Sequence, residues 1–173
     1  MHRLSITAIG RDRPGIVAAV TRILFEQGCN LADCAMTMLG GQFAMIMLLD
    51  APDALSAEQL GEALAEVESA LDLSIDVHTA PPGSTPPPAR PYVLSVYGAD
   101  HPGIVYRVTA ELAARQVNIT DLVSRIVSDL YTVVLDLDLP EGLDAGELEA
   151  DLRAIAQEVG LDLSFRQADV DEL

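Results

Sequence analysis

Two short loops of the sequence carry the residues best suited to hold a charged small molecule. They read GRDRPGIV at residues 10–17 and GADHPGIV at residues 98–105. The first glycine of each loop permits a sharp turn or the close approach of a ligand. The second glycine, Gly15 or Gly103, leaves backbone amides uncovered at the predicted start of a helix. Free N–H groups and the helix dipole at such a start attract an anion such as a carboxylate.

Charged and amide side chains near these loops match the two ends of an amino acid. Asp12 and Asp100 are placed to pair with an ammonium group. Asn30 and Asn118 begin the next predicted strand, on the side of the fold where we expect the loops. Their amide groups can donate to a carboxylate and accept from an ammonium, as a zwitterionic amino acid requires. The alternative is that the loops are ordinary strand-to-helix turns in which both aspartates cap helices.

The remaining polar residues do not assemble a catalytic or metal site. His101 follows Asp100 directly, and adjacent side chains rarely face each other, so a contact with the loop or a ligand is expected. Cys29 and Cys34 lack the close spacing of zinc ligands, and so few cysteines favour a reducing compartment. The sequence shows no phosphate loop, dinucleotide fingerprint or nucleophile elbow. We therefore predict a protein that is not an enzyme and needs no metal or cofactor.

The two loops belong to a unit that the chain contains twice. Residues 10–33 and 98–121 are identical at 11 of 24 positions, and the offset of 88 continues on both sides without a gap. Between the copies, PPGSTPPPAR contains five prolines, which favour an extended spacer. We predict a first domain at 1–80, a Pro-rich linker at 81–90, a second domain at 91–168 and an acidic tail at 169–173.

Each copy predicts the order strand, helix, strand, strand, helix, strand. Leu4, Ile6 and Ala8 alternate with polar residues, as in a half-buried strand. Pro14 opens a helix whose apolar residues recur with a 3.6-residue period. The order is that of an α+β, ferredoxin-like fold, in which an antiparallel four-stranded sheet carries both helices on one face.

The turn at residues 40–41, Gly-Gly, is typical of a two-residue hairpin and assigns the flanking side chains to two faces. We predict that one of these faces packs in the core. Its members are Cys34, Met36, Met38, Phe43, Met45 and Met47. The second helix of each copy is predicted to begin with a capping pair. These pairs are Ser56 with Gln59 and Asp144 with Glu147.

The paired D-R/H-P-G-I-V loops, an asparagine 15 positions after each motif glycine and the βαββαβ order resemble the ACT domain family. Two such domains with little else resemble, more narrowly, the glycine cleavage system transcriptional repressor family. The resemblance implies that amino acids or other small effectors bind at domain interfaces, through the loop after the first strand and the start of the second. The positions that match are Asp12, Arg13, Gly15, Ile16, Asn30, Asp100, His101, Gly103, Ile104 and Asn118.

Composition narrows the class of partner. The chain has 27 acidic residues against 10 basic ones, and its formal net charge is −17. Because nucleic-acid binding rests on Lys and Arg neutralising phosphates, we expect no direct contact with nucleic acid, and the same charge disfavours anionic membranes. The sequence shows neither a run of about 20 apolar residues, which a membrane span needs, nor a secretory signal. We expect a cytoplasmic protein.

Together these features predict a non-enzymatic regulator that senses an amino acid. It is expected to bind a small amino acid, glycine or similar, at ACT domain interfaces, to form a homodimer and to modulate a protein partner such as a transcription regulator. One alternative is a regulatory subunit or module that acts on an enzyme of amino-acid metabolism. Another is an interaction scaffold that binds no ligand.

Overall fold

In the computed structural model the chain divides into two compact units, Met1–Ser84 and Thr85–Leu173. The structure describes residues 1–81, 89–127 and 130–168. Most of the predicted linker and the whole predicted tail therefore lie outside the described residues. Ala89 and Arg90, which the sequence assigned to the linker, are already the first residues of the first strand of the second unit. That strand extends because both residues pair with the neighbouring strand of their sheet.

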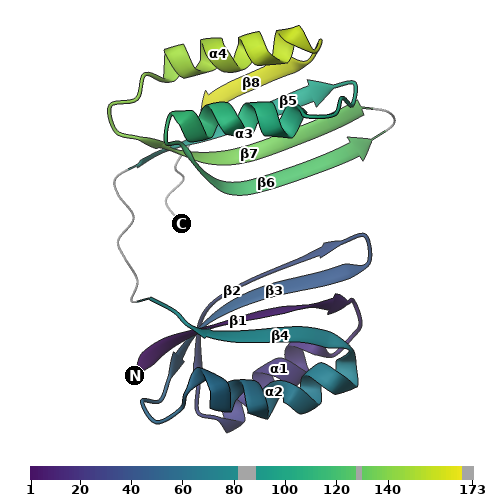
Figure 1. Cartoon of the computed structure of the whole chain (residues 1–173), viewed down its shortest axis with the longest axis vertical. Helices are drawn as coiled ribbons and strands as arrows, with labels where there is room; N and C mark the ends of the chain where they lie inside the picture. The colour runs from purple at the N-terminus through teal and green to yellow at the C-terminus, as the bar shows by residue number, and fades with distance from the viewer. Residues whose placement is uncertain (82–88, 128–129, 169–173) are drawn as a thin grey trace. The chain divides into compact units, whose positions relative to one another are not determined.

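Each unit has the element order βαββαβ (Figure 1). In the first unit the elements are β1 (His2–Arg11), α1 (Ile16–Glu26), β2 (Asn30–Leu39), β3 (Gln42–Ala51), α2 (Ala57–Leu71) and β4 (Leu73–Thr79). In the second they are β5 (Ala89–Gly98), α3 (Ile104–Ala114), β6 (Asn118–Val127), β7 (Leu130–Pro140), α4 (Ala145–Glu158) and β8 (Asp162–Gln167). The sheets have the orders β2-β3-β1-β4 and β6-β7-β5-β8, with every pairing antiparallel. Both helices cover one face of each sheet, which confirms the predicted ferredoxin-like fold.

The helix starts follow from local side-chain chemistry. The Ser56 hydroxyl accepts a hydrogen bond from the Gln59 amide, and the Gln59 side chain accepts one from the Ser56 amide, so α2 begins with a full capping box. At α4 the Asp144 carboxylate accepts bonds from the amides of Gly146 and Glu147. The helices that follow the two predicted binding loops, α1 and α3, begin differently and have no side-chain cap.

Each unit has its own hydrophobic core between its sheet and its helices. In the first unit the predicted inward residues of β1, Leu4, Ile6 and Ala8, are all fully buried. The apolar face of α1 buries Ile16 and Leu24 against them. No buried side chain among the described residues is polar or charged, so packing of apolar groups stabilises both cores.

The methionine-rich face of the β2–β3 hairpin is only half buried. Its members share one face, as predicted, because Met36 lies opposite Met45 and Met38 lies opposite Phe43. Met45 and Phe43 are buried, but Met36 and Met38 are 52% and 59% exposed. The prediction that the whole face packs in the core is therefore wrong. β2 is an edge strand of its sheet, and all of its residues are exposed, whereas β1 and β3 carry buried residues of the core.

Candidate functional site

The first predicted loop lies at the mouth of an open hollow of about 520 Å³. The hollow lies between this loop, the first turns of α1 and the β2–β3 hairpin. Its lining residues are Asp12, Arg13, Gly15, Ile16, Val17, Ala18, Thr21, Met36 and Phe43. The Asp12 amide donates a 3.1 Å hydrogen bond to the carbonyl oxygen of Gly41, which fastens the loop to the hairpin turn. The structure thus brings together four of the five residues predicted for this copy.

The first backbone amides of α1 donate no hydrogen bond to a capping side chain. Gly15 has φ = 97°, a left-handed conformation that glycine adopts without strain, and the space above its Cα is empty to 4 Å. Gly103 has the same form, with φ = 90° and the same open space. Neither Asp12 nor Asp100 caps the helix that follows, so the capping role that the alternative gave these aspartates is wrong. The first-turn N–H groups of α1 are therefore available to an anionic group at the hollow.

The first glycine of each loop has a packing role. A Cβ on Gly10 would lie 2.7 Å from Leu73 Cδ2 and 2.8 Å from the Asp72 carbonyl oxygen. A Cβ on Gly98 would lie 2.5 Å from Leu161 Cδ2. The close approach expected at these positions is thus made by the chain's own segment before and at the last strand of each unit, and not by a ligand.

The two asparagines lie away from the loops of their own copies. Asn30 lies opposite Asp50, which also lies opposite Arg3 at the beginning of β1, whereas Asp12 follows the end of β1. Eight strand residues, or roughly 26 Å, separate these two ends of the sheet. Asn118 is placed in the same way, opposite Asp138. The prediction that the asparagines lie on the same side as the loops is wrong, because α1 and α3 return the chain to the end where the first strand began.

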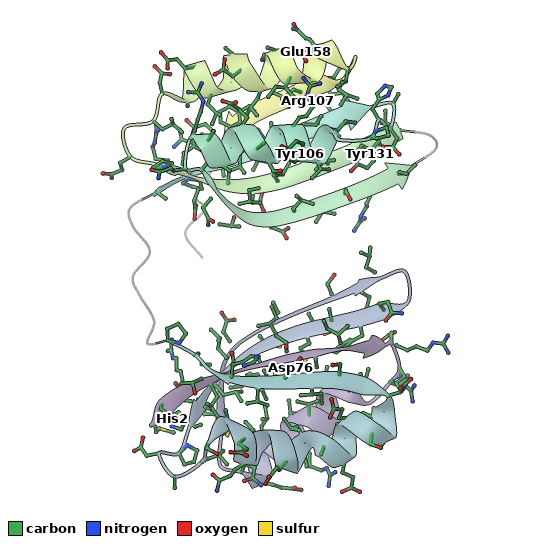
Figure 2. All side chains as sticks on the ribbon, in the orientation of Figure 1. His2, Asp76, Tyr106, Arg107, Tyr131 and Glu158 are labelled. Atoms are coloured by element: carbon green, nitrogen blue, oxygen red, sulfur yellow. The ribbon has the colours of Figure 1, made fainter. Side chains whose placement is uncertain are left out.

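The loop of the second copy has different neighbouring residues from the loop of the first. Its predicted residues Asp100, His101, Gly103 and Ile104 surround the start of α3, where the Ile104 amide donates to the His101 carbonyl oxygen at 3.5 Å. Tyr106 stands where the first copy has Ala18, and it is 75% exposed (Figure 2). Below α3 lies a narrow apolar void with no room for water. The void is lined by Val96, Ile104, Val105, Val108, Thr109, Val133 and Leu135.

The two loops also differ in charge. The first contains two cations, Arg11 and Arg13, where the second contains Ala99 and His101. Only Arg13 of the first pair lines the hollow. The first loop therefore presents more positive charge than the second, because a guanidinium and an uncapped helix start both line its hollow.

Sequence reasoning missed the apolar part of the lining. Met36 and Phe43 were assigned to the core, and Val17, Ala18 and Thr21 were not considered as site residues. The available signal was the register counted from the Gly-Gly turn, which places Met36 and Phe43 on the same face of the hairpin. The missing information was that β2 extends beyond the helices and leaves this side chain accessible.

Other chemistry is sparse in the described part of the chain. No group of three or more His, Cys, Asp or Glu side chains there could hold a metal ion. The two cysteines are free; Cys34 is exposed, and burial raises the pKa of the half-buried Cys29 thiol. Among the described helices, none has the length and apolar character that crossing a membrane requires.

Both copies match the ACT domain, at residues 2–78 and 90–166. The chain therefore belongs to the ACT domain family. Within that family it belongs with the glycine cleavage system transcriptional repressors. The repressor of Escherichia coli (strain K12) is 34% identical to it over 166 residues, which cover 91% of this chain and 86% of that protein.

Two further likenesses agree with a duplicated domain. The crystal structure of an unknown protein from Galdieria sulphuraria has a TM-score of 0.81 and 30% identity, and the match covers 97% of this chain and 99% of that one. A UPF0237 protein of Methanopyrus kandleri is 41% identical over 78 residues, which cover 44% of this chain and 84% of that protein. The second likeness therefore spans about one copy of the repeat.

Proposed function

We propose that this chain is a non-enzymatic regulator that senses a small amino acid, glycine or one of similar size, through its ACT domains. The observation that carries the proposal is the hollow of the first copy. It places an anion, Asp12, and a cation, Arg13, beside a helix start with uncapped amides. These are the groups that the ammonium and the carboxylate of an amino acid require.

In the proposed binding mode the ligand carboxylate lies at the start of α1, where it accepts hydrogen bonds from the amides that follow Gly15 and from Arg13. The ammonium group pairs with Asp12. The ligand's carbon atoms face Ile16 and Met36 on the apolar side of the hollow. In the second copy the corresponding groups are Asp100, His101, Gly103 and Ile104.

Asn30 and Asn118 enter this proposal only as residues donated by another domain. Each lies at the far end of its own strand from its own loop. A neighbouring strand that runs antiparallel reverses this order and brings its first residue to the loop end. We therefore propose a homodimer in which the ligand site is completed by a second domain.

The proposed partner of the sensor is a protein, such as a transcription regulator with a basic surface. Support comes from the relative in Escherichia coli, which is named a transcriptional repressor, and from the net charge of −17, which repels nucleic acid itself. Ligand binding would change the affinity for this partner by shifting the pairing of domains. We place the protein in the cytoplasm.

The first test is thermal unfolding of the purified chain with each common amino acid in turn, with glycine and serine first. A ligand that binds only the folded state raises Tm, by an amount that grows with its concentration. We expect a selective rise that is lost in Asp12→Asn and Arg13→Ala. Arg11→Ala is the matched control, because Arg11 is the last residue of β1, two positions before Arg13, and lies outside the hollow.

The second copy is tested with His101→Ala in the same experiment. A rise lost only in the first-copy variants places the sensor site there, and a rise lost only in His101→Ala places it in the second copy. If no amino acid at millimolar concentration changes Tm, the sensor proposal is wrong and the interaction scaffold takes its place.

A further inference from the structure

Most of the sulfur atoms of the chain lie on one face of one hairpin. The sequence contains five methionines and two cysteines. In the register of β2 against β3, Cys34 lies opposite Met47 and Met36 lies opposite Met45. Met38 follows on the same face of β2, because side chains of a strand alternate between its two faces. Five of the seven sulfur-containing side chains thus share the face of the β2–β3 hairpin that is turned to the core.

Burial in the core explains only the two methionines of β3. Met45 and Met47 are buried, whereas Cys34, Met36 and Met38 are exposed. An exposed methionine gives up the packing for which its flexible side chain is commonly used. Cys34 forms no disulfide, so its thiol is free to react. The three sulfur atoms of β2 are therefore accessible to a solute.

The second copy shows that the fold does not require sulfur at these positions. Val133 and Leu135 are buried like the two methionines that they match, so apolar bulk is sufficient in the core. At the offset of 88, the residues that match the five sulfur-containing positions are Leu122, Ser124, Ile126, Val133 and Leu135. The sulfur atoms are therefore a property of the first copy and not of the repeated unit.

We propose that Cys34 and Met36 bind a soft monovalent cation, Cu(I), with Met45 as the third sulfur within reach. Thiolate and thioether groups are the protein ligands that select Cu(I). Because the thiolate is the ligand, binding replaces the S–H bond of Cys34 by an S–Cu bond and releases one proton to the solvent. The proposal does not depend on amino-acid binding.

Strand geometry determines which sulfur atoms can share one ion. Cys34 and Met36 are next neighbours on their face, about 6.8 Å apart along the strand. The three rotatable bonds of a methionine allow its sulfur to approach the cysteine. Met45 is closer to Met36, since directly opposite residues have Cβ atoms about 4.5–5.5 Å apart. Cys34 and Met38 are about 14 Å apart along the strand, so both cannot bind the same ion.

The surroundings of the two sulfur atoms disfavour harder ions. Structural zinc sites use four Cys, His or carboxylate ligands. Among the described residues, no group of three or more His, Cys, Asp or Glu side chains could provide them. The nearest carboxylate in sequence, Asp33, accepts a 2.8 Å hydrogen bond from the Cys34 amide and is thus held by the backbone. The site therefore offers sulfur and selects an ion that prefers it.

An anaerobic titration tests the site, with Cu(I) supplied as its coloured complex with bicinchoninate. We expect the chain to remove one Cu(I) from this chelator. Cys34→Ser and Met36→Leu should each lower the affinity at least about tenfold, because each removes one soft ligand and preserves the size of the side chain. Met38→Leu and Cys29→Ser are the matched controls and should bind Cu(I) like the parent. A Met36→Leu variant that binds like the parent, or a Met38→Leu variant that is weakened equally, would overturn the site.

Alkylation of the unsubstituted chain provides a second measurement that needs no variant. Iodoacetamide reacts with the exposed Cys34, and mass spectrometry of peptides measures the extent of reaction. One equivalent of Cu(I) should slow this reaction strongly, whereas the same amount of Zn²⁺ should not. Absence of protection by Cu(I), or equal protection by Zn²⁺, would refute the proposal. The amino-acid thermal shifts are measured without copper, so failure of one proposal leaves the other standing.

Discussion

Gly10 and Gly15 belong to one loop motif but answer to different physical constraints. A side chain at Gly10 would collide with Leu73 and with the backbone at Asp72. A side chain at Gly15 would meet nothing within 4 Å, but it would have to adopt φ = 97°. The first glycine therefore allows two segments to pack, and the second sets the backbone turn that opens the helix start to the hollow.

This distinction predicts separate effects of two alanine substitutions. Gly10→Ala should lower the free energy of unfolding of the first unit by about 1–3 kcal/mol, as expected for an overpacked contact. Ligand binding by the remaining folded protein should persist. Gly15→Ala should lower the free energy of unfolding by about 1–2 kcal/mol through backbone strain alone. It should also reduce the ligand-induced rise in Tm. Urea unfolding with and without ligand measures both quantities.

Gly61 provides a control at which alanine should raise the free energy of unfolding rather than lower it. It lies inside α2, where an added Cβ would make only an ordinary contact at 3.9 Å with Val77. Gly61→Ala should therefore raise stability by about 0.5–1 kcal/mol. Equal losses for all three substitutions would show that neither packing at Gly10 nor the turn at Gly15 is as described.

The two units have the same fold but differ in the ion pairs between their two helices. In the second unit α3 and α4 are joined by the ion pairs Arg107–Glu158 and Arg115–Asp151 (Figure 2 labels the first pair). At the offset of 88 the first unit has Ala19 and Ala70 in place of the first pair, and Gln27 and Ala63 in place of the second. The α3–α4 contact therefore includes ion pairs whose matched positions in the first unit carry uncharged residues.

At this scale we predict that Asp151→Asn lowers the Tm of the second unit by about 1–3 °C in dilute buffer, as expected for a partly exposed pair. The loss should shrink at 1 M NaCl, because salt screens such pairs. Glu62→Gln on α2 is the control, since the described residues show no ion pair for Glu62. A loss that does not change with salt would assign the effect to packing rather than charge.

The elements also show what could be predicted from the sequence. The β2–β3 register followed from the Gly-Gly turn, since a two-residue period leaves no freedom once the turn is placed. The exposure of Met36 could not be predicted, because the period tells which face a residue shares but not how far the helices extend over it. The position of Asn30 was predicted wrongly because it depends on the direction in which α1 carries the chain from β1 to β2. The packing role of Gly10 could not be predicted because its contact, Leu73, is far away in the sequence.

The whole molecule is dominated by an excess of negative charge. The ion pairs among the described residues engage seven carboxylates, against 27 acidic residues in the chain. Salt therefore has two opposite effects, since it weakens these few attractions and also screens the repulsion among all the remaining carboxylates. Because each exposed ion pair contributes little, the screening of repulsion should decide whether added salt raises or lowers the stability of the chain.

We therefore predict that the chain as a whole becomes more stable as salt is added, although the α3–α4 contact becomes weaker. Raising NaCl from about 20 mM to 500 mM shortens the screening length from roughly 20 Å to 4 Å and should raise Tm by several degrees at pH 7. At pH 5, closer to the isoelectric point of about 4.2, the net charge is smaller and the gain should shrink. A steady fall of Tm with salt at pH 7 would mean that the ion pairs outweigh the repulsion. In that case the acidic surface would be locally compensated, and the case for a basic protein partner would lose its electrostatic basis.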